Sequence, residues 1–249
     1  MVVSGLERVP TGINGLDELL GGGLPRGRCI LLCGGPGSGK TIFGVQFLLQ
    51  GVKANEPGIF VTLEENSLQL KENMRSFGWD LNELDKAMKL AMVDLSPILY
   101  LSPTEFKKAV SGLKAPEFTI ESVTTAIKNA VRLLKSKRIV VDGVTSLLVQ
   151  EPDPALRRRD IAYLFNALLE TGCTCLLTAE IKAAALARDF QLEEYMAQGV
   201  IVMQTMERGG QLINTMQVEK MRGIDHDRQP HPYFITGKGI EVFPKEKVL

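Results

Sequence analysis

Short apolar runs alternate with longer amphipathic stretches along most of the chain, and this alternation predicts its elements. The apolar runs are rich in aliphatic or β-branched side chains, as buried parallel strands are. They are residues 28–35, 57–66, 90–94, 138–143 and 173–180. The predicted helices between them are residues 40–54, 67–78, 119–137 and about 154–171. Strands alternating with helices predict right-handed crossovers and a mostly parallel sheet covered by helices on both faces.

The pattern changes after residue 199. Residues 199–205, 212–223 and 233–243 resemble strands joined by glycine-containing turns, and no long helical pattern separates them. These three segments predict an antiparallel meander at one edge of the sheet. Residues 95–118 contain Pro97, Pro103 and Pro116 and predict an irregular connection. Without an internal repeat, residues 1–249 are expected to form a single α/β domain.

Composition narrows the function classes. Lysine and arginine together number 29, as do aspartate and glutamate, so the net charge is zero, whereas a dedicated nucleic-acid binder usually has a basic excess. No apolar run approaches the roughly 18 to 20 residues that span a bilayer. The first residues lack a secretory signal pattern, so a cytoplasmic protein without membrane association is expected. Reduced, buried thiols are expected at Cys29, Cys33, Cys173 and Cys175.

Residues 34–41, GGPGSGKT, fit G-x-x-x-x-G-K-[ST] between a predicted strand and a predicted helix. Glycines let successive backbone N–H groups turn inward around an anion, and the helix N-terminus adds partial positive charge. Lys40 then reaches the β- and γ-phosphates of a nucleotide, and the Thr41 hydroxyl ligates Mg²⁺. A glycine-rich turn with an incidental lysine is the alternative. The predicted phosphate-binding residues are Gly35, Pro36, Gly37, Ser38, Gly39, Lys40, Thr41 and Ile42.

Three carboxylates follow predicted strands. Asp142 ends the run RIVVD, where a second magnesium ligand is expected, although it could simply end a strand. Glu64 and Glu65 end the strand after the phosphate-loop helix, at the sheet edge where the nucleotide is expected. One of them could orient or deprotonate the attacking water. The alternative is that the pair caps the next helix.

The phosphate loop, EPGIFVTLEEN, FGWD, VVDGVTSL, CLLTAE and VEKMRGIDHD together resemble the KaiC family of RecA/RadA-like ATPases. The segment VPTGINGLDELLGGGLPRGRCILLCGGPGSGKT is especially similar. The resemblance covers nearly the whole chain and implies one RecA-like P-loop NTPase domain with a C-terminal antiparallel extension. It also implies ATP and Mg²⁺ as cofactors, and a ring, commonly a hexamer, with ATP held between subunits.

The resemblance assigns roles to particular residues. Glu64 and Glu65 match the catalytic carboxylates, with Glu64 favoured as the base. Lys220 and Arg222 match a Lys-x-Arg pair that reaches the neighbouring subunit's γ-phosphate, and their spacing directs both side chains to one face of a strand. His226 matches a position near the neighbour's sugar or base, with a surface histidine as the alternative. Thr178 and Glu180 end the predicted strand beside that of Asp142, where RecA-like ATPases have a polar residue that senses the γ-phosphate, so the resemblance implies this role for Thr178 or Glu180.

Departures from the family limit these expectations. The clock protein's phosphorylated Ser-Thr pair has no convincing counterpart here, so the resemblance does not imply autophosphorylation. Neither the segment after Asp142 nor the segment after Glu180 is glycine-rich with interleaved aromatic and cationic residues, so neither resembles a DNA-contacting loop. Residues 157–159 are three consecutive arginines, explained by a solvated helix face, a subunit contact or a nucleic-acid patch.

The leading hypothesis is therefore a KaiC-like ATPase that assembles into a ring, hydrolyses ATP slowly, and regulates or signals through a protein partner still to be identified. The first alternative is a recombinase paralogue that binds single-stranded DNA and modulates recombination or repair. The second is a nucleotide-bound scaffold with little turnover.

Overall fold

The computed structural model describes residues 6–96, 119–148, 151–181, 191–246 and 248. Most of the predicted irregular connection at 95–118 lies outside the described residues. Parts of the segments after Asp142 and Glu180, residues 149–150 and 182–190, also lie outside them.

Nine strands of the described residues form one mixed sheet in the order β11-β10-β9-β8-β3-β7-β6-β4-β5. The strands are β3 (Cys29–Gly34), β4 (Gly58–Thr62), β5 (Leu90–Asp94), β6 (Arg138–Asp142), β7 (Thr174–Glu180), β8 (Gly199–Arg208), β9 (Gln211–Met221), β10 (His231–Thr236) and β11 (Gly239–Val242). The six strands from β8 to β5 in this order run parallel. The predicted parallel core is therefore confirmed.

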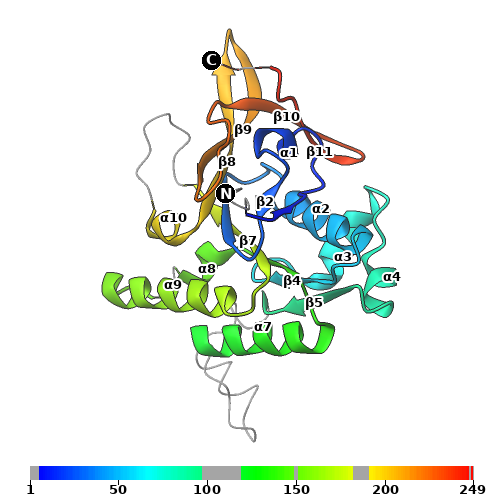
Figure 1. The fold of residues 1–249 in the computed structure, drawn as a ribbon, viewed down its shortest axis with the longest axis vertical. Coiled ribbons are helices and arrows are strands. Elements are labelled where there is room, and N and C mark those ends of the chain that lie inside the picture. Colours follow the sequence, from blue (N-terminus) through cyan, green and yellow to red (C-terminus); the bar gives the residue numbers. More distant parts are fainter. Residues whose placement is uncertain (1–5, 97–118, 149–150, 182–190, 247, 249) are drawn as a thin grey trace, which may run out of the picture.

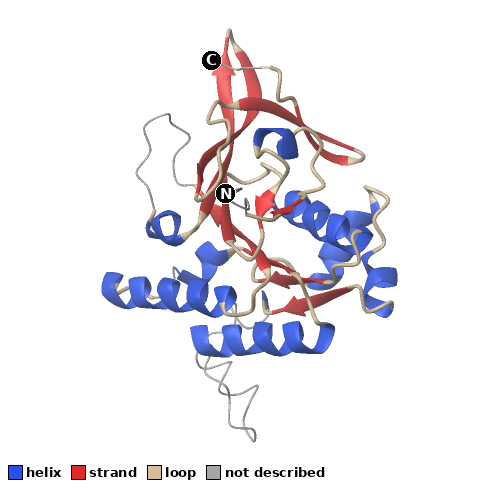
Figure 2. Cartoon of the chain, viewed as in Figure 1, coloured by secondary structure: helices blue, strands red, loops and turns tan. Residues whose placement is uncertain are grey.

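Helices cover both faces of the sheet (Figures 1 and 2). The helices are α1 (Leu16–Leu19), α2 (Lys40–Lys53), α3 (Ser67–Arg75), α4 (Leu81–Lys86), α7 (Ile120–Leu134), α8 (Val144–Leu148), α9 (Pro154–Leu169) and α10 (Leu192–Met196). In Figure 1, α7 and α9 lie below the sheet, and α2, α3 and α4 lie on its right. The predicted long helices are confirmed, and α1, α4, α8 and α10 are short helices that periodicity did not predict.

Each buried strand contributes to two cores because successive side chains point to opposite faces. Ile30 and Leu32 of β3 join the core beneath α2, together with Phe43 and Phe47. Leu31 lies in the other core, which α7 and α9 cover. The continuous apolar runs in the sequence thus reflect strands that are buried on both sides.

Capping residues set where the long helices begin. The Asp153 carboxylate accepts hydrogen bonds from the N–H groups of Ala155 and Leu156, and Pro154 occupies the first turn of α9. Thr119 and Ser122 form a reciprocal capping box at the start of α7. These local signals explain why the amphipathic patterns became helices with defined starts.

The C-terminal strands form the predicted antiparallel extension at one edge. β8 is parallel to β3 and antiparallel to β9, and β10 pairs antiparallel with β9 and β11. β8 therefore joins the parallel core to the extension, which occupies the upper part of Figure 1. A separate antiparallel ladder joins β1 (Arg8–Val9) to β2 (Leu24–Pro25).

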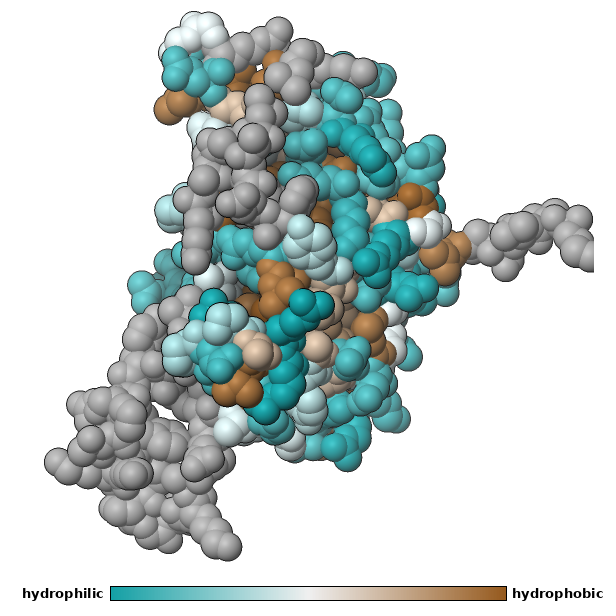
Figure 3. Space-filling view, turned by 90° about the vertical axis from the view of Figure 1, so that its left-hand side faces the viewer, coloured by the Kyte–Doolittle hydropathy of each residue, from teal (hydrophilic) through white to brown (hydrophobic). Residues whose placement is uncertain are grey.

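Within the described residues, no helix combines the length and apolar character needed to cross a membrane. Figure 3 shows the side of the molecule that carries α9 and α10, where hydrophobic surface forms separate patches among hydrophilic surface. All four cysteines are free and buried, as predicted.

Candidate nucleotide-binding site

The loop between β3 and α2 has the backbone of an anion cradle. Gly37 and Gly39 have φ angles of 75° and 93°, in the left-handed region that glycine adopts most readily. The loop ends at the N-terminus of α2, where unpaired N–H groups favour negative charge. The Lys40 ammonium donates to the carbonyls of Gly34 and Gly35, at 2.9 Å each. The Lys40 cation and the N-terminus of α2 therefore both lie at the phosphate loop.

The side chains of three elements meet at Asp142, the last residue of β6. Its two oxygens accept hydrogen bonds from the hydroxyls of Thr41, at 2.9 Å, and Thr178, at 2.5 Å. Thr178, from β7, also accepts a bond from the Gly143 amide at 2.8 Å. This contact places Thr178 directly in the Asp142 network.

Burial raises the pKa of the Asp142 carboxyl, and the nearby Glu64 charge adds to the rise. The hydroxyls of Thr178 and Thr41, with the Lys40 charge, oppose it. A partly desolvated carboxylate next to a hydroxyl is an oxygen donor set of the kind that suits Mg²⁺. In the described part of the chain, no three His, Cys, Asp or Glu side chains cluster as a metal cage. A magnesium ion with few protein ligands, completed by phosphates and water, fits these residues.

Glu64 lies against the turn that follows Asp142. The Ser146 hydroxyl, from α8, donates a hydrogen bond to a Glu64 carboxylate oxygen. At Gly143, which has a φ of 91°, an added Cβ would come within 2.6 Å of the Glu64 carboxyl carbon. The backbone conformation therefore favours glycine at 143, and a larger residue would also displace the Glu64 carboxylate.

Glu65 has a different environment from its neighbour. The Asn73 amide, from α3, donates to its carboxylate at 2.6 Å. Burial, followed by the charge of Asp142, raises the pKa of Glu65, and the Asn73 bond opposes the rise. Glu65 lines a pocket of about 580 Å³ together with Lys40 and Thr41. The sequence predicted both glutamates but offered no signal for their partners Asn73 and Ser146.

Glu180 lies at the exposed end of β7 and contacts the same region through its backbone. Its amide donates to the Thr145 hydroxyl of α8 at 2.9 Å. Two residues of α8 therefore contact residues that the sequence predicted for the site: Ser146 bonds to Glu64, and Thr145 bonds to Glu180.

Lys220 and Arg222 share a face, as their spacing predicts. The Lys220 ammonium donates to the carbonyl of Glu194 at 2.8 Å, and both side chains donate to the carbonyl of Tyr195, at 3.2 and 3.4 Å. Burial, then the charge of Arg222, lowers the pKa of Lys220, and Glu194 opposes this shift.

These two cations line a pocket of about 620 Å³ that also contains Tyr195 and Arg228. Among the described residues, none that lines this pocket also lines the pocket beside Lys40. Lys220 pairs with Val200, which pairs with Leu31 near the start of β3, so one chain holds Lys220 and Arg222 away from the phosphate loop that follows the end of β3.

His226 follows β9 and is partly buried. Its ring Nδ1 lies 3.4 Å from the Ile224 carbonyl, and its amide donates to the Asp225 carboxylate at 3.0 Å. Like Lys220 and Arg222, it is not among the residues of the phosphate-loop pocket in the part of the chain described.

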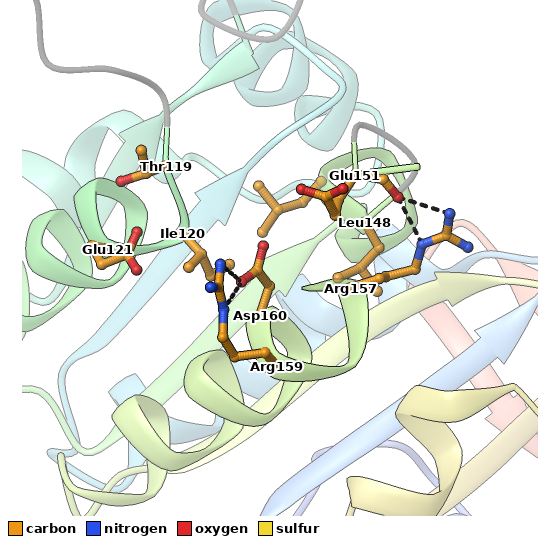
Figure 4. A pocket seen from close by; sticks show the side chains of 9 residues that line it. Thr119, Ile120, Glu121, Leu148, Glu151, Arg157, Arg159 and Asp160 are labelled. Carbon is orange, nitrogen blue, oxygen red and sulfur yellow. Dashed lines mark hydrogen bonds and ion pairs between the residues drawn. The ribbon is translucent and has the colours of Figure 1, made fainter. Parts of the chain in front are cut away.

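The arginine run at 157–159 lies on α9 beside a smaller pocket of about 290 Å³ (Figure 4). Arg157 donates twice to the Glu151 carbonyl, at 3.0 and 2.7 Å. Arg159 donates twice to the Asp160 carboxylate, at 3.1 and 3.0 Å. Two of the three arginines thus have acceptors within the chain, which weakens their interpretation as a nucleic-acid patch.

Comparison with known proteins shows that the chain is similar to one family. A family model described as the KaiC ATPase matches residues 9–247. A UPF0273 protein of Pyrococcus horikoshii is 39% identical over 244 residues, covering 98% of this chain and 96% of its own length. A UPF0273 protein of Methanocaldococcus jannaschii is also 39% identical, with 98% and 99% covered.

Two further similarities extend this comparison. The circadian clock protein KaiC3 of Synechocystis is 36% identical over 96% of this chain and 46% of its own length. The solved structure of a KaiC-like protein from Pyrococcus horikoshii has a TM-score of 0.80 and 34% identity, covering 96% of this chain and all of the other.

Proposed function

Because the chain belongs to the KaiC family of ATPases, we propose that it binds Mg·ATP at residues 34–41 and hydrolyses it slowly at the subunit interfaces of a ring-shaped homo-oligomer. A hexamer is the proposed ring, acting in regulation or signalling in the cytoplasm. The observation that carries the proposal is the contact of Thr41 and Thr178 with Asp142, beside Lys40. This set supplies a phosphate-binding cation and oxygen ligands for Mg²⁺ at the end of a parallel sheet.

The proposed roles follow from what each group can do. Lys40 and the N–H groups of the loop bind phosphate oxygens, and Thr41 and Asp142 hold Mg²⁺, which supplies charge neutralisation of the phosphates when bound. Glu64 or Glu65 orients the attacking water. Glu65 lines the pocket with Lys40, and Glu64 is held by Ser146, so each has a structural argument in its favour.

The separation of Lys220 and Arg222 from the loop supports a role across an interface. Both side chains point to a pocket lined by Tyr195 and Arg228, while the proposed γ-phosphate position lies beside Lys40. Cations supplied by a neighbouring subunit would stabilise the charge that develops on the transferred phosphoryl group. His226, near the same end of β9, is proposed to approach the neighbour's nucleotide as well.

The test is steady-state ATP hydrolysis by the purified chain, with and without single-stranded DNA at low salt. Lys40→Ala controls for contaminating ATPases and should abolish turnover, because it removes the phosphate-binding cation. Slow hydrolysis that DNA does not alter supports the proposal. Severalfold stimulation by DNA would instead favour the recombinase paralogue, and binding without turnover would favour the scaffold.

Assembly is measured alongside by light scattering with and without Mg·ATP. A nucleotide held between subunits stabilises the assembled form, so ATP should increase the ring population. Assembly and thermal stability that are both unaffected by ATP would contradict an interfacial site.

A further inference from the structure

The carbonyl groups of the phosphate loop accept hydrogen bonds from the protein itself. The Gly35 carbonyl accepts from Lys40 and, at 2.8 Å, from the Ser38 hydroxyl. The Ser38 carbonyl accepts at 2.7 Å from the hydroxyl of Tyr233. Tyr233 belongs to β10 in the antiparallel extension, so a distant segment of the chain contacts the backbone of the loop directly.

A bond to the Ser38 carbonyl also determines where the next amide points. The peptide unit between Ser38 and Gly39 is planar and trans, so its C=O and N–H groups point in opposite directions. The orientation of this unit depends on ψ of Ser38 and φ of Gly39, and Gly39, at a left-handed φ of 93°, has no Cβ to restrict it. Gly39 therefore leaves the orientation of this peptide weakly determined by the loop alone.

Tyr233 is well suited to fix that orientation because it is itself immobilised. Its side chain is 1% exposed and belongs to the core beneath α2. The hairpin of β10 and β11 is bonded to α2 through Gln46, which accepts from the Ile240 amide at 2.6 Å and donates to its carbonyl at 3.3 Å. An added Cβ on Gly39 would come within 2.8 Å of Ile235, so the hairpin also packs against the loop.

We propose that Tyr233 is a positioning residue of the phosphate loop: its hydroxyl fixes the Ser38–Gly39 peptide so that the Gly39 N–H faces the bound phosphates. This inference rests on the proposed function, because it assumes that residues 34–41 bind a nucleotide. Burial raises the pKa of Tyr233 to about 12, so the hydroxyl keeps its proton and remains a donor at neutral pH.

The test is Tyr233→Phe, which keeps the buried ring and removes the donor. Isothermal titration calorimetry measures binding of Mg·ADP and of magnesium pyrophosphate, the second probe reporting on the phosphate cradle without a nucleoside. Both should bind about fivefold to tenfold more weakly, because the lost hydrogen bond orients the Gly39 N–H that is proposed to bind the charged phosphates. Tyr163→Phe, at a half-exposed tyrosine of α9, is the matched control and should bind both probes as the wild type does.

A merely structural role predicts a different result. It would lower the unfolding temperature of Tyr233→Phe without ligand and leave both affinities unchanged, and that outcome overturns the proposal. Gln46→Met, which releases the hairpin from α2 while keeping Tyr233, provides a second variant and should weaken pyrophosphate binding in the same direction. If the wild type binds neither probe, the proposed function itself fails, and the inference fails with it.

Discussion

The parallel core and the antiparallel extension both carry predicted nucleotide-binding side chains, but they hold them in different ways. In the core, polar side chains from three elements contact one another, with Asp142 accepting from Thr41 and Thr178. In the extension, Lys220 and Arg222 donate to backbone carbonyls at the end of α10 and line a separate pocket.

The difference separates binding from catalysis. One chain contains the connected set of groups proposed to bind phosphate and Mg²⁺, so the proposal assigns nucleotide binding to a single subunit. Its two candidate transition-state cations lie elsewhere in the fold, so the proposed role for them requires a second copy of the chain. Binding and turnover should therefore respond differently to changes in the two regions.

The largest expected effect comes from Arg222→Ala. Removing the cation that is proposed to act on the transferred phosphoryl group should lower kcat roughly 10³-fold. Binding of Mg·ATP should be retained, since the groups around Asp142 are unchanged. Single-turnover hydrolysis and calorimetric binding, measured on the same preparation, separate the two effects.

Mixing two inactive variants then tests whether the cation acts between subunits. Lys40→Ala lacks the phosphate-binding lysine but keeps Arg222, and Arg222→Ala has the reverse defect. In randomly mixed rings, about a quarter of the interfaces would combine an intact loop with an intact arginine, because interfaces in a ring are heterologous. Recovery of about that share of wild-type activity is expected. A mixture no more active than its components would place the arginine's action, if any, within one subunit.

The same contrast explains which parts could be predicted from the sequence. The phosphate loop is a contiguous motif, and Asp142 ends β6 while Thr178 lies two residues before the end of the neighbouring parallel strand β7, so both lie at one edge of the sheet. The contact between Tyr233 and Ser38 joins segments 195 residues apart and has no local signal. α8 and α10 have five residues each, too few to show helical periodicity.

Arg138 is a second feature that the sequence pattern concealed. It begins β6 and looks like a polar residue at a strand end, yet its side chain is 1% exposed. The guanidinium pairs with Glu56 at 2.8 Å, donates to two backbone carbonyls, and lies 4.7 Å from the Phe47 ring centroid. A charged residue can occupy the core here because its donors are paired, and that depends on partners from three other segments.

A smaller effect is expected from Thr178→Val, which tests the core side of the comparison. Valine keeps the shape of the side chain but removes the hydroxyl that donates to Asp142. If Asp142 binds Mg²⁺ as proposed, Thr178 orients that carboxylate, so the Mg²⁺ concentration for half-maximal ATPase activity should rise about tenfold. Thr205→Val, at an exposed position of β8, is the control. An unchanged Mg²⁺ requirement would show that Thr178 does not support the magnesium ligand.

Ser146→Ala and Asn73→Ala distinguish the two glutamates with a still smaller effect. Each removes the hydrogen-bond donor of one carboxylate, Ser146 for Glu64 and Asn73 for Glu65. The variant whose carboxylate orients water should lose about fivefold in kcat with KM unchanged, because positioning acts on the chemical step. Ser146→Thr, which keeps a hydroxyl, should restore activity if Glu64 is the base. Equal activity of both alanine variants and the wild type would contradict a positioning role for either donor.

The smallest expected effect concerns the pH dependence that Lys220 gives to the extension. Burial and the adjacent Arg222 charge lower the pKa of Lys220, so its cation is lost at a lower pH than that of an ordinary lysine. If the cation acts in catalysis, kcat/KM should fall as the pH rises through this lowered pKa. Lys220→Arg keeps a charge at all accessible pH values, so its alkaline limb should lie at higher pH, with about a twofold difference at the upper end. Coincident limbs for the two proteins would mean that the proton on Lys220 does not control turnover, and would leave Arg222 as the cation that the extension supplies.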